Sequence, residues 1–146
     1  MAQMLALCAE HAEYEGLPFA ETGQIERWKV ALFAEPARLF AWVCDGVDGT
    51  PLAGYMTATI DYSTWLAHHF IYLDCLFLRP SHRGHGLGRA LMSVLQTFAQ
   101  DKGCAAIEWQ TPPTNALGLG FYRAIGAREL EKVRLSLPVI QSEIKE

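Results

Sequence analysis

The feature that most constrains this chain is a glycine-rich turn, Arg83-Gly84-His85-Gly86-Leu87-Gly88-Arg89. It follows an apolar run at 70–78 that is typical of a strand, and it opens an amphipathic helix over 87–100. The first backbone N–H groups of a helix are unpaired and lie at the positive end of its dipole. Glycines let this backbone approach an anion closely, and the two arginines can add positive charge. The turn therefore predicts a binding site for a pyrophosphate.

Two familiar phosphate motifs do not fit this turn. The P-loop pattern GxxxxGK[ST] requires a Lys followed by Ser or Thr, and no such pair follows these glycines. The dinucleotide fingerprint GxGxxG lies early in a βαβ unit, whereas the spacing here is GxGxG and comes after several strands. On the turn alone, a glycine-rich connection that binds no ligand explains the residues equally well.

Hydrophobic periodicity and turn residues divide the whole chain into elements. Two helices come first, over 1–15 and between Thr22, as the N-cap, and Pro36. We then expect strands at 39–44, 52–61 and 70–78, a helix at 87–100, a strand at 105–110, a helix at 115–125 and a final strand at 128–137. This order predicts one mixed α/β (α+β) domain over 1–146, with helices packed on a sheet.

Composition and charge exclude several classes of function. The 146 residues are 51% hydrophobic and 19% charged, with a formal net charge of −4, and this mixture suits a packed globular core. Lys and Arg form no run, so we expect no nucleic-acid partner. No apolar stretch approaches the ~20 residues of a membrane helix, and no signal peptide is visible. We therefore expect a soluble, cytoplasmic protein with no membrane partner.

The cysteines and histidines do not form a metal-binding pattern. Cys8, Cys44, Cys75 and Cys104 include no closely spaced pair, which structural zinc sites require. His82 and His85 are close in sequence but have no Cys or acidic residue beside them. We expect free thiols and no metal.

The turn resembles the (Q/R)-x-x-G-x-(G/A) pyrophosphate loop of the GNAT superfamily of acetyl-CoA-dependent N-acetyltransferases. The preceding strand, the following helix and the stretch with Asn115, Phe121-Tyr122 and Gly126-Ala127 are similar to the rest of the GNAT core, in the same order over about 39–137. The resemblance implies a central, mostly antiparallel sheet with a splayed V between its two central strands, flanked by about four helices. It also implies acetyl-CoA as cosubstrate and a homodimer.

Within that superfamily, the chain is most similar to diamine acetyltransferases of the spermidine/spermine type. The similar segments are a strand at 72–78, an aromatic turn at 62–65 and the pattern Phe-Tyr-x-x-x-Gly-Ala at 121–127. Asp74 stands where that group usually has Glu, and Cys75 stands where it often has Asp. The family's fold usually opens with a strand before the first helix, and this sequence has only about three residues there, so we expect that strand to be absent or its edge of the sheet to be filled differently.

The resemblance also implies how the chain would act on an amine. Tyr122 is similar to the family's general acid, which protonates the leaving thiolate; a core tyrosine is the structural alternative. The amine would attack directly in a ternary complex, rather than through an acetylated Cys75. An alkylammonium with a pKa of ~10.4 must first lose a proton. Asp74 is the candidate base, or the anchor of the substrate's charge, and Glu108 is the second choice.

The position of Asp74 in its strand predicts that it shares one face of the sheet with Tyr72 and Leu76. The resemblance implies that backbone groups near Leu76 bind the thioester oxygen and the pantetheine arm, and that Asn115 bonds this arm or orders its helix; a simple N-cap is an equal alternative. The expected acetyl-CoA residues are Leu76, Phe77, Leu78, Arg83, Gly84, His85, Gly86, Leu87, Gly88, Arg89, Asn115 and Tyr122.

Acidic and aromatic residues are candidates for holding the amine acceptor. Glu10, Glu13 and Glu15 lie on or just after the first helix, where a solvated helix face is the alternative explanation. Aromatic rings can stack on an alkylammonium or can simply belong to the core. The residues that we select for substrate binding are Glu13, Asp61, Trp65 and Trp109.

Three functions compete at this point. The first is acetylation of a small-molecule primary amine: a polyamine, a lysine-like compound, an amino acid or an aminoglycoside. The second is acetylation of a protein or peptide, which the short loops disfavour because a peptide needs a groove. The third is a non-catalytic acyl-CoA-binding module, which the presence of Tyr122 disfavours.

Overall fold

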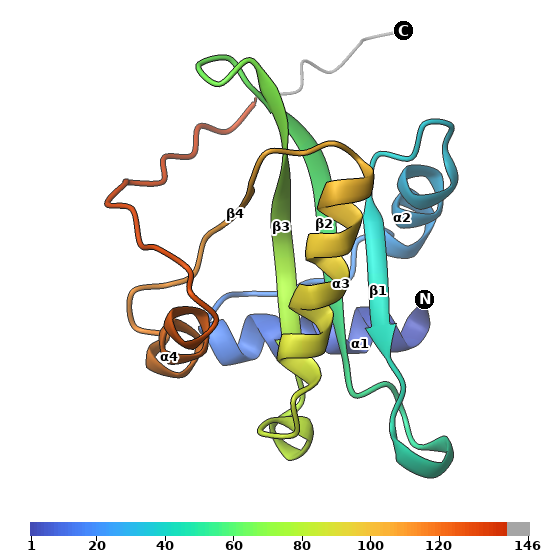
Figure 1. The fold of residues 1–146 in the computed structure, drawn as a ribbon. Helices are drawn as coiled ribbons and strands as arrows, with labels where there is room; N and C mark the ends of the chain where they lie inside the picture. The colour runs from blue at the N-terminus through green and yellow to red at the C-terminus, as the bar shows by residue number, and fades with distance from the viewer. Residues whose placement is uncertain (140–146) are drawn as a thin grey trace, which may run out of the picture.

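The computed structural model describes residues 1–139, in which four α-helices surround a four-stranded sheet (Figure 1). The helices are α1 (Ala2–Glu15), α2 (Gln24–Phe33), α3 (Leu87–Asp101) and α4 (Ala116–Ala124). The strands are β1 (Phe40–Cys44), β2 (Gly54–Ser63), β3 (His68–Leu78) and β4 (Ile107–Trp109). None of the helices described is long and apolar enough to cross a membrane.

The sheet is mostly antiparallel and splays open beside β3. Its strand order is β1-β2-β3-β4, with antiparallel pairs except for the parallel pair β3/β4. The β3/β4 pairing begins at Ile71↔Ile107 and ends at Leu73↔Trp109, whereas β3 continues to Leu78. Beyond Leu73, β3 and the segment that follows β4 diverge (Figure 1). This arrangement confirms the expected mixed α/β fold with a mostly antiparallel sheet. The V, however, opens between β3 and the edge strand β4, and not between the two central strands, because β2 and β3 stay paired as far as Leu78.

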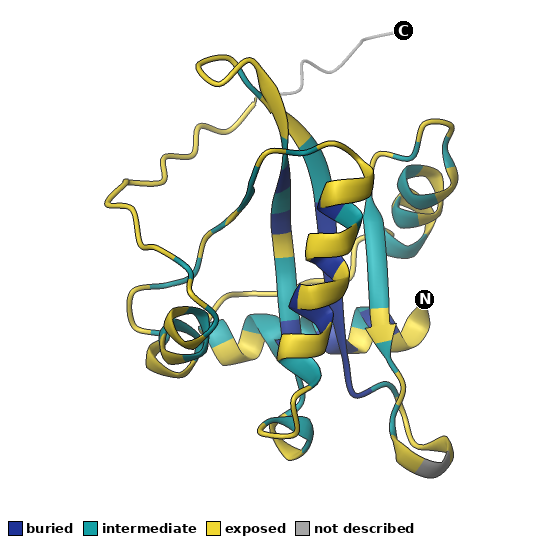
Figure 2. Cartoon of the chain, in the orientation of Figure 1, coloured by how far each residue is buried: buried dark blue, intermediate teal, exposed yellow. Residues whose placement is uncertain are grey.

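Two apolar clusters attach helices to the two faces of the sheet. On one face, Leu91 and Leu95 of α3 pack on Met56 and Ile71; on the other, Leu7 of α1 packs in a cluster with Tyr55 and Phe77. Figure 2 shows the buried residues concentrated in the sheet and along the inner side of α3. Full burial of an aliphatic side chain contributes about 1.5–3 kcal/mol. These contacts therefore hold α1 and α3 on opposite sides of β3.

A β-bulge interrupts the β2/β3 pairing at Asp74. Thr57 pairs with Cys75, whereas Ala58 pairs with Leu73, so Asp74 has no partner in the register. An extra residue reverses the alternation of the strand. Leu73 and Leu76 accordingly pack with the same cluster, on the α3 side. The prediction that Asp74 shares one face with Tyr72 and Leu76 was wrong, because the bulge places those two neighbours on opposite faces.

The predicted final strand at 128–137 was also wrong, because residues 128–139 contain neither helix nor strand. A strand needs a neighbour for its backbone hydrogen bonds, and no strand within residues 1–139 pairs with this segment. Its apolar side chains are correspondingly exposed, by 70% to 90%. They are Leu130, Val133, Leu135, Leu137 and Val139.

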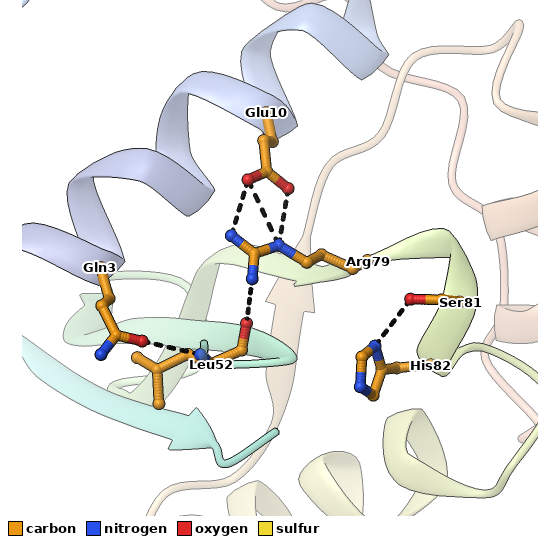
Figure 3. Close-up of polar contacts among 6 residues, drawn as sticks. All are labelled: Gln3, Glu10, Leu52, Arg79, Ser81 and His82. Carbon is orange, nitrogen blue, oxygen red and sulfur yellow. Dashed lines mark hydrogen bonds and ion pairs between the residues drawn. The ribbon is translucent and has the colours of Figure 1, made fainter. Parts of the chain in front are cut away.

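An ion pair fastens α1 to the end of β3 (Figure 3). The Arg79 guanidinium donates from Nη2 to Glu10 Oε1 at 2.7 Å and from Nε to Glu10 Oε2 at 2.9 Å. Its Nη1 donates to the backbone oxygen of Leu52 at 2.8 Å, and the Leu52 N–H donates to Gln3 Oε1 at 2.7 Å. The structure therefore gives Glu10, one of the three acids near the first helix, a structural partner.

We expect the substitution Glu10→Gln to lower the free energy of unfolding by about 1 kcal/mol at pH 7, the upper range for exposed pairs. Hydrogen bonds from Arg79 hold the pKa of Glu10 below its ordinary value of 4.5. The stabilisation is therefore present above pH 4.5 and is lost as the pH falls through the lowered pKa. Urea unfolding of the wild type and the variant at several pH values measures this stabilisation. Glu13→Gln, at an exposed position of the same helix, is the control, and equal effects of the two substitutions would contradict the prediction.

Candidate active site

A cavity of about 360 Å³ lies at the opening of the V. Residues from α1, β3, the glycine-rich turn, the segment after β4 and α4 line it. Of the twelve residues predicted for acetyl-CoA, ten lie on its wall; His85 and Leu87 do not. Because these ten come from 76 to 122 of the chain, only the folded sheet brings them together. Those ten are Leu76, Phe77, Leu78, Arg83, Gly84, Gly86, Gly88, Arg89, Asn115 and Tyr122.

The strand wall of the cavity is the part of β3 beyond its pairing with β4. Leu76, Phe77 and Leu78 all line the cavity, and β4 pairs with β3 only as far as Leu73. Among residues 1–139, therefore, no strand pairs with one edge of this segment. An extended ligand can pair with such an edge as an added strand would.

The glycine-rich turn closes one end of the cavity. Gly84 and Gly86 have φ values of +79° and +83°, which side chains rarely tolerate, and Gly86 is the N-cap of α3. The Arg83 guanidinium is held in place, since its Nε donates to the backbone oxygen of Leu78 at 2.8 Å and its Cζ lies 4.8 Å from the centre of the Tyr14 ring. This end combines a helix N-terminus with a fixed positive charge, as anion binding requires.

Asn115 caps α4 and links it to α1. Its Oδ1 accepts from the Gly118 N–H at 3.0 Å and from the Tyr14 hydroxyl at 2.8 Å. Its Nδ2 donates to Thr111 Oγ1 at 2.8 Å. A Cβ on Gly118 would lie 2.3 Å from Asn115 Nδ2, so any larger residue at this position would displace the capping side chain. The structure supports the ordering role of Asn115, while a bond to the pantetheine arm stays a prediction.

Tyr122 is the half-buried phenol on the α4 wall. Its ring lies 5.1 Å from that of Trp109, centre to centre. Burial, followed by the nearby Glu15 and Tyr14, raises the pKa of Tyr122 to about 12. The phenol is therefore protonated throughout the neutral range and can donate a proton into the cavity.

The acceptor residues predicted from sequence divide into two groups. Asp74 and Trp109 line the cavity, and Asp74 accepts from the Cys75 thiol with Sγ and Oδ2 3.7 Å apart. Asp61 and Trp65 lie at the other end of β3, in the β2/β3 hairpin, where Trp65 is 98% exposed. Glu13 and Glu108 are also exposed and off the cavity wall.

The sequence analysis did not predict most of the residues that α1 contributes to the cavity wall. His11, Tyr14 and Glu15 all line the cavity, although they precede β3 by more than fifty residues. The one local signal is the spacing of His11 and Glu15, four residues apart, which places them on one face of a helix. Nothing local indicates that this face packs beside β3.

Comparisons with known proteins agree with this geometry. Residues 3–127 match the model of the acetyltransferase (GNAT) family. The chain is 29% identical over 133 residues to a thialysine N-epsilon-acetyltransferase of Bos taurus, across 87% of this chain and 78% of that protein. It is 27% identical over 118 residues to an L-ornithine N5-acetyltransferase of Arabidopsis thaliana, across 81% of this chain and 50% of that protein.

A solved aminoglycoside N-acetyltransferase in complex with CoA has a similar fold, with a TM-score of 0.67 and 23% identity, across 80% of this chain and 87% of that chain. The matched family region contains β3, the glycine-rich turn, α3 and α4, which together build most of the cavity wall. The chain belongs to the GNAT family of acetyltransferases.

Proposed function

We propose that this enzyme transfers an acetyl group from acetyl-CoA to a primary amine of a small molecule of the polyamine, lysine-like or amino-acid type. One observation carries the proposal: a single cavity combines a helix N-terminal turn, a free strand edge, a phenol and the carboxylate of Asp74. Relatives named for thialysine, ornithine and aminoglycosides support a small amine acceptor.

The residues of the cavity fit acetyl-CoA. The unpaired N–H groups at the start of α3, with Arg83 and Arg89, suit the pyrophosphate. The free edge of β3 suits the amide groups of the pantetheine arm. When bound, acetyl-CoA supplies an activated thioester, and a backbone N–H near Leu76 would donate to its oxygen.

The side chains suit direct transfer to the amine. Asp74 would accept the proton that the ammonium must lose, and Tyr122 would protonate the departing thiolate, whose parent thiol has a pKa of ~8.5. Burial raises the pKa of Cys75 to about 11. Its thiol is therefore neutral and a poor nucleophile, which supports direct attack over an acetylated cysteine.

The decisive experiment is a thiol-release assay with acetyl-CoA and a panel of amines. The panel contains spermidine, putrescine, lysine, thialysine, ornithine, several amino acids and aminoglycosides. Turnover on one class identifies the acceptor. Tight acetyl-CoA binding without turnover on any of them would instead favour a protein or peptide acceptor, or a non-catalytic module. Failure to bind acetyl-CoA would refute the proposal.

We also propose a homodimer in the cytoplasm. The alternating apolar side chains of 128–139 are 70% to 90% exposed, and the outer edge of β4 has no neighbouring strand within residues 1–139. An exposed apolar strand-like segment and a free edge are complementary between two copies. The four cysteines form no disulfide in the structure, which suits a reducing compartment.

Leu135→Asp is expected to shift the protein from dimer to monomer, because it places a charge in the middle of the alternating segment. Light scattering after size exclusion measures the mass at several concentrations. Val30→Asp, at another exposed apolar position, 73% exposed on α2, should leave the mass unchanged. A wild-type protein that is monomeric at every concentration would contradict the dimer.

A further inference from the structure

The aromatic ring of Tyr14 supports the arginine of the glycine-rich turn. The Cζ atom of Arg83 lies 4.8 Å from the centre of the Tyr14 ring and 5.5 Å from that of Phe77. The face of an aromatic ring attracts a guanidinium, and the planar shape of the guanidinium lets it stack there. Because Arg83 Nε also donates to the backbone oxygen of Leu78 at 2.8 Å, two rings and one hydrogen bond fix the orientation of this side chain.

The charge of Arg83 is available to a ligand of the cavity that it lines. Among the side chains that the structure describes, no carboxylate lies within ion-pair distance of Arg83, whereas Glu10 neutralises Arg79. Since Nε already has a partner, the two terminal nitrogens of the Arg83 guanidinium are the donors for an anion. A guanidinium that is fixed before binding loses less conformational freedom when the anion arrives, and therefore binds it more tightly.

The hydroxyl of Tyr14 contacts the start of α4. It donates to Asn115 Oδ1 at 2.8 Å, and the same oxygen accepts from the Gly118 N–H at 3.0 Å. The helix has nine residues, and none of them is fully buried. Because a short helix depends on its packing for stability, contacts at its cap matter more when that packing is incomplete. The bond from Tyr14 therefore fixes the first turn of the helix that carries Tyr122.

We propose that Tyr14 is a positioning residue that couples the anion-binding turn to α4: its ring aims Arg83 at the pyrophosphate of acetyl-CoA, and its hydroxyl holds Tyr122 toward the thioester. The inference rests on the proposed function and deepens it. Tyr14 lies in the last turn of α1, a helix that the buried Leu7 attaches to the sheet. A single side chain on a fixed helix thereby serves both cofactor binding and proton donation.

The structure separates Tyr14 from the residues that hold α1 in place. Met4 and Leu7 are buried in the cluster beneath the helix, and Glu10 pairs with Arg79. Tyr14, in contrast, is 44% exposed. An exposed side chain contributes little to the core, so substitutions of Tyr14 should leave the fold intact. They therefore test the site and not the stability of the protein.

The role of the ring is tested by the affinity for acetyl-CoA, measured by calorimetry. Tyr14→Leu should weaken binding about tenfold, whereas Tyr14→Phe keeps the ring and should bind within about twofold of wild type. In an Arg83→Ala background, Tyr14→Leu should cost less than about twofold, because the partner of the ring is already gone. A merely structural role would cost the same factor in both backgrounds. Phe33→Leu is the control, because it removes a ring that is 76% exposed on α2 and off the cavity wall.

The role of the hydroxyl is tested by kcat on the amine that the wild type acetylates. Tyr14→Phe should lower kcat about three- to tenfold at unchanged acetyl-CoA affinity, because the cap of α4 loses one hydrogen bond. In a Tyr122→Phe background the same substitution should change kcat by less than about twofold, since no phenol is left to be misaligned. A general disturbance of the fold would lower kcat equally in both backgrounds.

Each half of the inference has a result that overturns it. For the ring, that result is a wild-type acetyl-CoA affinity in Tyr14→Leu, or an equal loss of affinity with and without the Arg83 side chain. For the hydroxyl, it is a wild-type kcat in Tyr14→Phe, or an equal loss with and without the Tyr122 hydroxyl. Wild-type turnover would leave the proposed function intact in each case. A wild type that neither binds acetyl-CoA nor acetylates any amine would refute the proposed function, and this inference with it.

Discussion

Tyr122→Phe is expected to lower kcat by about 10²–10⁴-fold, the usual contribution of a general acid. The substitution removes one hydroxyl and keeps the ring against Trp109, so folding and acetyl-CoA binding should be preserved. With a pKa of about 12, the phenol of the wild type stays protonated well above neutral pH. The wild type should therefore show no loss of activity from this group below about pH 11.

Steady-state kinetics with calorimetric binding of acetyl-CoA checks this expectation. Tyr72→Phe is the matched control, because it removes a phenol hydroxyl from β3 that does not line the cavity. Its kcat should remain within about twofold of wild type. If Tyr122→Phe behaves in the same way, another group or water protonates the leaving thiolate.

Gly86→Val is expected to weaken acetyl-CoA binding by more than tenfold. Gly86 caps α3 with φ near +83°, a conformation that a β-branched residue adopts only with strain. A left-handed residue costs about 1–2 kcal/mol, so the turn will rearrange or the protein will lose that stability. Rearrangement of the turn would displace the backbone of Gly86, which lines the cavity. Calorimetry of acetyl-CoA binding and urea unfolding measure the two effects separately.

Gly103→Val is the control that separates the effect of backbone strain from the effect on acetyl-CoA binding. Gly103 also has a positive φ, +64°, and a Cβ there meets no atom within 4 Å. It lies just beyond the opposite end of α3, away from the cavity. This variant should lose a similar amount of stability and keep acetyl-CoA affinity. Equal losses of affinity in the two variants would show that strain alone, and not the turn, governs binding.

Local sequence was sufficient to predict most of the helices and strands. The helix predicted over 87–100 is α3 (Leu87–Asp101), and Asn115 caps α4 through its own side chain. These predictions succeeded because capping and amphipathic spacing act within a few residues. The predicted N-cap of α2, Thr22, was wrong: the N-cap is Gly23, in the left-handed conformation with φ +80°. The carbonyl oxygen of Thr22 accepts a hydrogen bond from Arg27 Nη1.

The errors have non-local causes. The bulge at Asp74 depends on the register between β2 and β3, which no alternation within β3 reveals. The alternating segment 128–137 carries the pattern of a strand, but no strand among residues 1–139 pairs with it. Pairing is a property of two segments, so the pattern of one does not decide it.

The sequence by itself determined the glycine-rich turn, the helix that it opens, and the phenol and amide of α4, because each depends on neighbouring residues. Only the tertiary structure decided which acids line the cavity. It places Asp61 and Trp65 in the far hairpin, pairs Glu10 with Arg79, and brings His11 and Glu15 to the wall of the cavity that Tyr122 also lines. The physical reason is that the packing of α1 on one face of β3 and the splay on its edge arise from contacts between residues far apart in the chain.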